Sequence, residues 1–339
     1  MINLKELADL CGVSIATISN TLNGKSNVSE ATKKRIMEKI RETGYQPNSM
    51  ARKLRSANTR TVAIIVEDIT AFGTPELING IMIYLESKKY DSVLLNMRLY
   101  NHPELDWHRD KIAFKSIVDK TVSEALAMRI EGIIYVAVHT RELECFDNSL
   151  PVPLVIAYSY PKDKKFPHVI IEDEKSAREL GEYIVKKGRK NVAVIAGRED
   201  NYHTAGRLRG LEDVLFENGI IIDKELVQYT TWMRKDGYAA CEKLMSTGKK
   251  IDTFCCQNDL LAGGVYDWCY DHGLEVGKDI LVTGFDNREF TNYLRPPLTT
   301  VELPHYDMAW WSGKLIVDQI EKNPVEIKTY AIQGKLIER

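Results

Sequence analysis

Apolar residues recur at helical spacing in three short stretches near the N-terminus. Asn3 can cap a first helix that Gly12 ends, and Ser14 can cap a second that runs to about Asn23. A third helix is predicted from about Ser29 to Gly44. Three short helices that share one apolar seam favour a small helix-turn-helix domain.

The second predicted helix has two distinct faces. Ile18 and Leu22 lie four residues apart and are predicted to face the small core. The opposite face then carries five other residues: Ile15, Ala16, Ser19, Asn20 and Asn23.

After about residue 60 the pattern changes to short apolar runs rich in β-branched residues, each followed by helical sequence. This alternation predicts parallel sheets with right-handed crossovers. The number of units favours two α/β subdomains with a ligand cleft between them. The runs are TVAIIV, DSVLLNM, GIIYVAV, LVIAY, NVAVIAG, DTFCCQND and ILVTGFD.

Charge is distributed unevenly between these two parts. Residues 1–60 hold 11 Lys or Arg against 5 Asp or Glu, whereas the other 279 residues hold 35 against 43. A basic head suits contact with phosphate, although a solvated charge run would look the same. No apolar run is long enough to span a membrane and no signal peptide is visible, so we expect a cytoplasmic protein.

The six cysteines form no CxxC pair and show no recurring spacing. Buried thiols are therefore expected rather than metal ligands or disulfides, and we predict no metal and no cofactor. The sequence also contains no Walker loop, no GxSxG, no HExxH and no GxGxxG after a core strand, so an enzyme is not predicted.

The N-terminal segment LKELADLCGVSIATISNTLNGKSNVSEATKKRIMEKIRETGYQPNSMARKLR resembles the headpiece of the lactose-repressor/galactose-repressor family along its whole length. The resemblance implies that the second helix enters the major groove of operator DNA. It gives Ile15, Ala16 and Asn20 base-reading roles, and it gives phosphate contacts or positioning of the helix to Ser14, Thr17, Ser19 and Asn23. Family members often carry Arg at the position of Asn20, and Asn favours adenine where Arg favours guanine. The alternative for Asn20 is a solvated surface residue.

The segment after Pro47 corresponds to the family's hinge. By position, Leu54 would be a wedge in the minor groove, with Asn48 and Ala51 also at the DNA. A flexible linker whose leucine packs on the core is the alternative.

The resemblance continues through the core, in RLRGLEDVL, QNDLLAGGVYDW, VTGFDN and PPLTTV among other segments, and implies a type I periplasmic-binding-protein-like fold. The predicted fold class is thus an all-α helix-turn-helix headpiece plus an α/β core of two parallel-sheet subdomains. By position, the effector-binding residues would be Phe72, Tyr158, Arg207, Trp232, Asn258 and Asp286. Structural roles compete with these: loop caps for Asn258 and Asp286, and core packing for Trp232. Several family members have a carboxylate where Tyr158 stands, which argues against a simple galactoside-type effector.

The predicted domains are a headpiece at 1–46, a hinge helix or linker at 47–58 and an effector-binding core at 59–339. Within the core we place one subdomain at about 59–160 plus 292–325 and the other at about 161–291. The segment 96–127 is interpreted as an insertion without an assigned role. The function predicted is a homodimeric regulator, a repressor by family, that binds double-stranded operator DNA and responds to a small molecule, a sugar by family. A sugar-binding module without regulatory output is the alternative.

Overall fold

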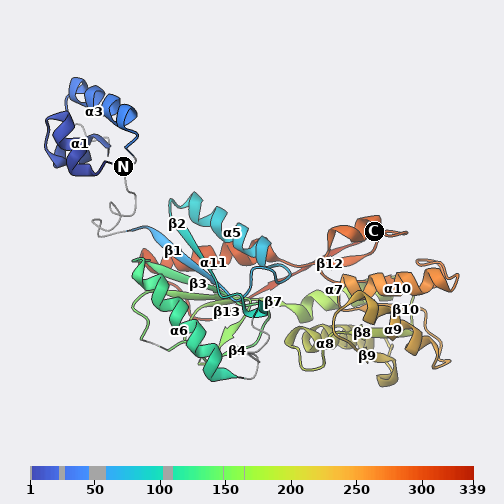
Figure 1. The fold of residues 1–339 in the computed structure, drawn as a ribbon. Helices are drawn as coiled ribbons and strands as arrows, with labels where there is room; N and C mark the ends of the chain where they lie inside the picture. The colour runs from blue at the N-terminus through green and yellow to red at the C-terminus, as the bar shows by residue number, and fades with distance from the viewer. Residues whose placement is uncertain (1, 23–26, 46–58, 102–109, 148, 164) are drawn as a thin grey trace. The chain divides into compact units, whose positions relative to one another are not determined.

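The computed structural model describes all residues except 1, 23–26, 46–58, 102–109, 148 and 164. The described chain divides into two compact units, a headpiece within residues 1–59 and a core of residues 60–339 (Figure 1). The expected hinge residues Asn48, Ala51 and Leu54 lie outside the described residues, as does Asn23.

The headpiece consists of α1 (Leu4–Cys11), α2 (Ile15–Leu22) and α3 (Glu30–Thr43). The predicted caps are confirmed: Asn3 accepts from the backbone N–H groups of Lys5 and Glu6, and Gly12 ends α1 in the left-handed conformation with φ of 59°. Ser29 likewise caps α3. The helices enclose a small core formed by Leu7, Ala8, Cys11, Ile18, Ile36 and Tyr45.

The core contains two parallel sheets, and we call the parts built on them the first and second lobes. The first lobe has six strands in the order β13-β7-β5-β3-β1-β2, and the second has four in the order β11-β10-β8-β9. The first-lobe strands are β1 (Thr61–Val66), β2 (Asp91–Asn96), β3 (Gly132–Val136), β5 (Leu154–Ala157), β7 (His168–Glu172) and β13 (Thr329–Gln333). The second-lobe strands are β8 (Val192–Ala196), β9 (Val227–Tyr229), β10 (Thr253–Cys256) and β11 (Leu281–Thr283).

Helices cover the faces of both sheets (Figure 1). The first lobe carries α5 (Thr74–Ser87), α6 (Lys111–Ala127) and α11 (His305–Ile320), of which α5 and α11 pack together. The second lobe carries α7 (Asp173–Lys186), α8 (Tyr202–Glu217), α9 (Arg234–Met245) and α10 (Asp259–Asp271), packed as the pairs α7–α8 and α9–α10. Short elements complete the core: η1 (Leu99–Asn101), η2 (Lys224–Leu226), η3 (Glu289–Tyr293), and the strand pairs β4 (Glu142–Leu143) with β6 (Tyr160–Pro161) and β12 (Thr300–Glu302) with β14 (Lys335–Ile337).

The chain crosses between the lobes at three places: after β7, after β12 and after β13. The division predicted from the sequence differs from this. Residues 168–172 belong to the first sheet rather than to the second subdomain, and β12 pairs with β14 rather than joining the first sheet. The edge strand β13 also lies beyond residue 325, where the first subdomain was predicted to end. Exposed residues alternate along this strand, so the sequence shows no apolar run there.

The segment 96–127 contains a crossover helix. Residues 111–127 form α6, which connects β2 to β3 and packs on the sheet, as a parallel β-α-β unit requires. Residues 111–127 therefore belong to the regular architecture of this lobe, and the interpretation of the rest of the segment as an insertion stays a prediction.

Arg60 fixes the point where the described core begins. Its guanidinium donates to the carbonyl oxygens of Lys88 (2.6 Å) and Lys89 (2.9 Å) at the C-terminal end of α5. It also lies 4.2 Å from the ring centre of Tyr90, and its backbone N–H donates to Glu131 (2.7 Å). A cation is favourable at a helix C-terminus, so Arg60 holds the start of the core against α5.

Candidate functional site

The outer face of α2 presents the residues predicted to read DNA. Ser14 caps this helix: its Oγ accepts from the Thr17 backbone N–H (3.1 Å) and lies 2.9 Å from the Thr17 Oγ1. Ile15 is 41% exposed and is therefore accessible to a partner. Ala16 is also exposed, whereas Ser19 and Asn20 are half-buried.

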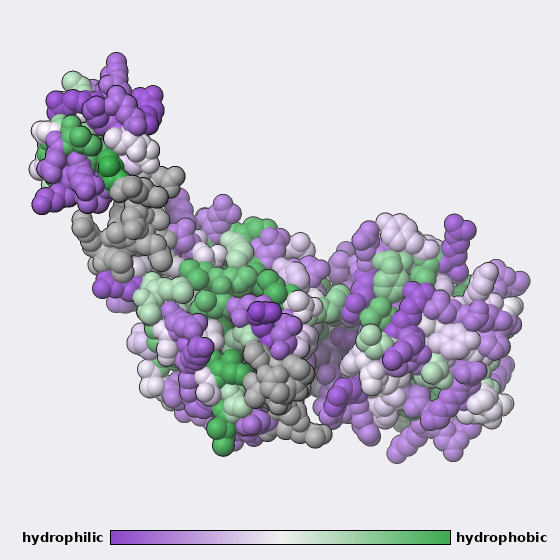
Figure 2. All heavy atoms as spheres, in the orientation of Figure 1, coloured by the Kyte–Doolittle hydropathy of each residue, from purple (hydrophilic) through white to green (hydrophobic). Residues whose placement is uncertain are grey.

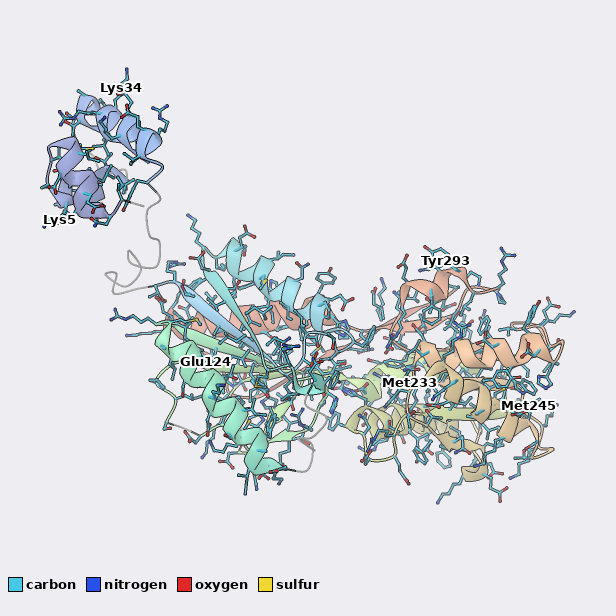
Figure 3. All side chains as sticks on the ribbon, in the orientation of Figure 1. Lys5, Lys34, Glu124, Met233, Met245 and Tyr293 are labelled. Atoms are coloured by element: carbon cyan, nitrogen blue, oxygen red, sulfur yellow. The ribbon has the colours of Figure 1, made fainter. Side chains whose placement is uncertain are left out.

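Basic side chains surround this small domain. Lys5 on α1 and Lys34 on α3 project outward from it (Figure 3). With an exposed apolar and polar face on α2, the headpiece has the parts that base reading and phosphate contact need.

The second candidate site lies between the lobes of the core, where Figure 2 shows a hollow with hydrophilic walls. A pocket of about 460 Å³ opens there. Phe72, in the loop after β1, belongs to the first lobe, and Asp286, in the loop after β11, belongs to the second. Arg288 and His305 also line the pocket.

Arg207 lies in a buried cluster next to this pocket. Its Nε donates to the Asp173 carboxylate (2.8 Å), its Nη1 donates to the Gln257 carbonyl (2.5 Å), and its guanidinium stacks 3.9 Å from the Phe285 ring centre. Burial alone would raise the pKa of Asp173, but its interactions with His203 and Arg207 outweigh that effect and lower the pKa. Asp173 therefore stays ionised and fixes Arg207 in place.

Tyr158 links this cluster to the first lobe. It follows β5 with a left-handed φ of 65°, is buried, and its ring centre lies 5.5 Å from that of His203 and 6.2 Å from that of His305. Burial raises the pKa of its phenol, which keeps the hydroxyl neutral and able to donate.

Asp286 has a buried side chain and a strained backbone, since its φ is 120°. Arg288 Nε donates to its Oδ2 (3.1 Å). Burial raises the pKa of Asp286, although Arg207 and Arg288 oppose that rise. A carboxylate held in this way is suited to accept hydrogen bonds from a ligand.

Trp232 and Asn258 lie deeper in the second lobe. Trp232 is half-buried against Gly197, and its ring centre is 5.9 Å from the Arg207 guanidinium. Asn258 caps α10 through the Leu261 N–H (2.8 Å) and donates to the Trp232 carbonyl (3.1 Å). A ligand-binding role for these two residues stays a prediction, since both already have structural roles.

Sequence reasoning missed four residues of the cleft: Asp173, His203, Arg288 and His305. One signal was present, because His203 and Arg207 are four residues apart on α8 and so share a face. His305 had no such signal. Its position next to Gly73 and Phe72 depends on the packing of α11 against α5.

Some properties can be stated only for the residues that the structure describes. Among them, no helix is long and apolar enough to cross a membrane, and no cluster of His, Cys, Asp or Glu is placed to hold a metal ion. All six cysteines are buried and unpaired.

A helix-turn-helix headpiece followed by a two-lobed core of parallel sheets defines a class of DNA-binding transcriptional regulators. Comparison with known families agrees: residues 3–48 match the model of bacterial regulatory proteins of the lacI family, and residues 182–339 match a periplasmic binding protein-like domain. The chain belongs to the lacI family of bacterial transcriptional regulators.

Two similar proteins of known name are transcriptional regulators. The HTH-type transcriptional regulator RegA of Clostridium saccharobutylicum is 31% identical over 99% of this chain and 98% of its own. Catabolite control protein A of Priestia megaterium is 30% identical over 96% of this chain and 94% of its own. The lac repressor dimer bound to operator and an anti-inducer superposes with a TM-score of 0.82 at 21% identity, covering 100% of this chain and 98% of that one, which shows the shared fold.

Proposed function

We propose that this regulator is a homodimeric repressor whose affinity for a near-palindromic operator is set by an uncharged sugar bound between the core lobes. The observation that carries the proposal is the convergence of groups from both lobes on one cleft. Phe72 of the first lobe and Asp286 of the second line the pocket, and Tyr158 of the first lobe and Arg207 of the second lie buried beside it.

Sugar chemistry suits these groups. An aromatic face such as Phe72 covers the apolar side of a sugar ring, and a carboxylate or guanidinium binds its hydroxyl groups. A solved relative, the regulator CelR in complex with cellobiose, has a TM-score of 0.65 at 23% identity over 100% of this chain and 99% of that chain, so a protein of this fold does bind a sugar. A ligand that contacts both lobes favours one lobe orientation, and it shifts operator affinity only by its differential affinity for the two orientations.

For DNA we propose that Ile15, Ala16 and Asn20 read bases while Ser14, Thr17, Ser19 and Asn23 contact phosphate or position α2. Asn48, Ala51 and Leu54 are proposed to act in the minor groove. One headpiece reads one half-site, so two-fold operator symmetry requires a dimer.

The test begins with a thermal-shift panel of mono- and oligosaccharides, because a ligand that binds the native state raises the melting temperature. Operator DNA is selected from a random pool, and its binding is titrated with and without the sugar that gives the largest shift. We expect a symmetric site and a change in operator affinity of tenfold or so, within the usual range of coupling energies. A sugar that binds without changing operator affinity, or a stable monomer at micromolar concentration in ultracentrifugation, contradicts the proposal.

A further inference from the structure

Arg288 spans the cleft between the lobes. Its backbone N–H donates to Asp259 Oδ2 (2.7 Å) on α10, which anchors it in the second lobe. Its guanidinium carbon lies 3.7 Å from the ring centre of Phe72, which belongs to the first lobe. Its Nε donates to Asp286 Oδ2 (3.1 Å).

These contacts use two groups proposed above to hold the effector. The guanidinium covers an aromatic face of Phe72, where a sugar ring would stack, and pairs with the carboxylate of Asp286, where a hydroxyl would donate. We propose that Arg288 is an internal occupant of the cleft, which joins the lobes in place of a ligand and which an effector must displace. This inference rests on the proposed function of the cleft.

Because the Asp286 carboxylate is buried, it needs a new partner when Arg288 leaves. The Asp286 side chain is only 6% exposed, and a buried carboxylate without a partner is costly. The Arg288 side chain is 24% exposed and adjoins the pocket of about 460 Å³, so its flexible stem has solvent to move into. A ligand that takes over Asp286 must therefore offer its own hydrogen-bond donor.

His305 adds a further requirement. Its Nε2 is buried and has no hydrogen-bond partner among the described residues, and its ring stands edge-on to Phe72 at 6.0 Å. Burial lowers the pKa of His305, which keeps the imidazole neutral. The ligand class that satisfies all three residues is an uncharged polyol with an apolar ring face, since an anion placed on Asp286 would be repelled.

The direction in which effector affinity changes when Arg288 is replaced distinguishes an internal competitor from a ligand contact. If Arg288 competes with the effector, only the molecules whose cleft is free of its guanidinium can bind. The apparent affinity for the effector is then reduced in proportion to that fraction. Removing the competitor raises effector affinity, whereas removing a ligand contact lowers it.

The experiment compares Arg288→Ala and Arg288→Met with the wild type. Arg234→Ala is a matched control, because Arg234 pairs with Asp267 (2.7 and 2.6 Å) and lies 5.9 Å from the Phe290 ring, all within the second lobe. Binding of uncharged mono- and disaccharides and of hexose 6-phosphates is measured by calorimetry. We expect both Arg288 variants to bind the uncharged sugars at least about tenfold more tightly, and Arg234→Ala to bind like the wild type. Weaker or unchanged binding by both Arg288 variants overturns the proposal, and so does a preference for the phosphates that disappears with Arg288.

A second measurement needs no ligand. Hydrogen exchange of the amides of residues 72–74 should become faster in both Arg288 variants and stay unchanged in Arg234→Ala, because only the former lose the bridge between the lobes. Unchanged exchange in the Arg288 variants overturns the bridging role. If no sugar binds any variant while this exchange does increase, the proposed sugar effector fails and the bridge stands.

Discussion

The backbone N–H of Thr140, in the first lobe, donates to Nε2 of His203, in the second lobe, at 3.3 Å. The other ring nitrogen, Nδ1, lies 2.6 Å from Asp173 Oδ2. Since Nε2 accepts, we assign the proton to Nδ1, which makes the imidazole neutral and an N–H donor to Asp173. A single histidine therefore connects the start of α7, the start of α8 and the loop after β3.

Replacing His203 tests this connection. His203→Phe keeps an aromatic ring but removes both hydrogen bonds, and it leaves Asp173 with Arg207 as its remaining charged partner. We expect a loss of about 1–3 kcal/mol of unfolding free energy in urea titrations. His203→Gln, which retains a donor and an acceptor, should lose less. A His203→Phe protein as stable as the wild type would show that the hydrogen bonds contribute nothing.

Stability should depend on pH through Asp259. Burial and the neighbouring Asp286 raise the pKa of Asp259 to about 7, against an ordinary value of 3.8. Between these values the folded state holds a proton that the unfolded chain has released, so the contribution of this proton is complete below about pH 4 and is lost as the pH rises through 7. Asp259→Asn should flatten the fall in melting temperature between pH 4 and pH 7. An unchanged pH profile in this variant would contradict the assignment.

Base preference should follow residue 20. Asn20→Arg should shift the preferred base at one symmetric operator position from adenine toward guanine, with about 1–3 kcal/mol of discrimination, because Asn and Arg pair with different base edges. Selection from random DNA before and after the change measures this. Lys34→Gln on α3, whose side chain points away from the headpiece (Figure 3), serves as the control and should leave base preference unaltered. Identical selected sites for Asn20→Arg and the wild type would place Asn20 outside the base-reading set.

The effector response should require Asp286. Asp286→Ala should remove the response to the sugar found in the panel while changing operator affinity without sugar by no more than about twofold, since the headpiece is untouched. The control is Asp267→Ala, which breaks the other arginine–carboxylate pair in the second lobe. Titration of operator DNA with and without sugar measures both. A mutant that still responds at the same sugar concentration would make Asp286 a structural cap.

The sequence was most informative where structure is local. The caps at Asn3 and Ser14 and the helix ends at Gly12 and Gly44 depend on neighbours within four residues, and all four are confirmed. The apolar runs likewise predicted β1, β3, β5, β8, β10 and β11, because buried parallel strands are continuously apolar, and they also predicted the partly exposed edge strand β2.

Prediction failed where a residue's role depends on distant chain segments. The edge strand β13 joins β7 from about 160 residues away, and its alternating pattern does not look buried. Arg288 could not be recognised as an occupant of the cleft, since its partner Phe72 is supplied by the other lobe. Asp173 and His305 were missed because their neighbours, His203 and Phe72, lie in the same lobe but far away in the chain.

Helix α5 connects the cleft to the contact made by Arg60. At its N-terminal end lie Phe72 and Gly73, beside the cleft, and just after its C-terminal end the carbonyl groups of Lys88 and Lys89 hold Arg60, where the described core begins. The helix turns by 100° with each residue, so inserting one residue into it would rotate the cleft end relative to the Arg60 end by more than a quarter turn. The length of α5 thus sets the rotation of the cleft end of the helix relative to the Arg60 end. Only insertions close to a whole number of helical turns would keep Phe72 facing Arg288 while Arg60 still donates to the carbonyls of Lys88 and Lys89.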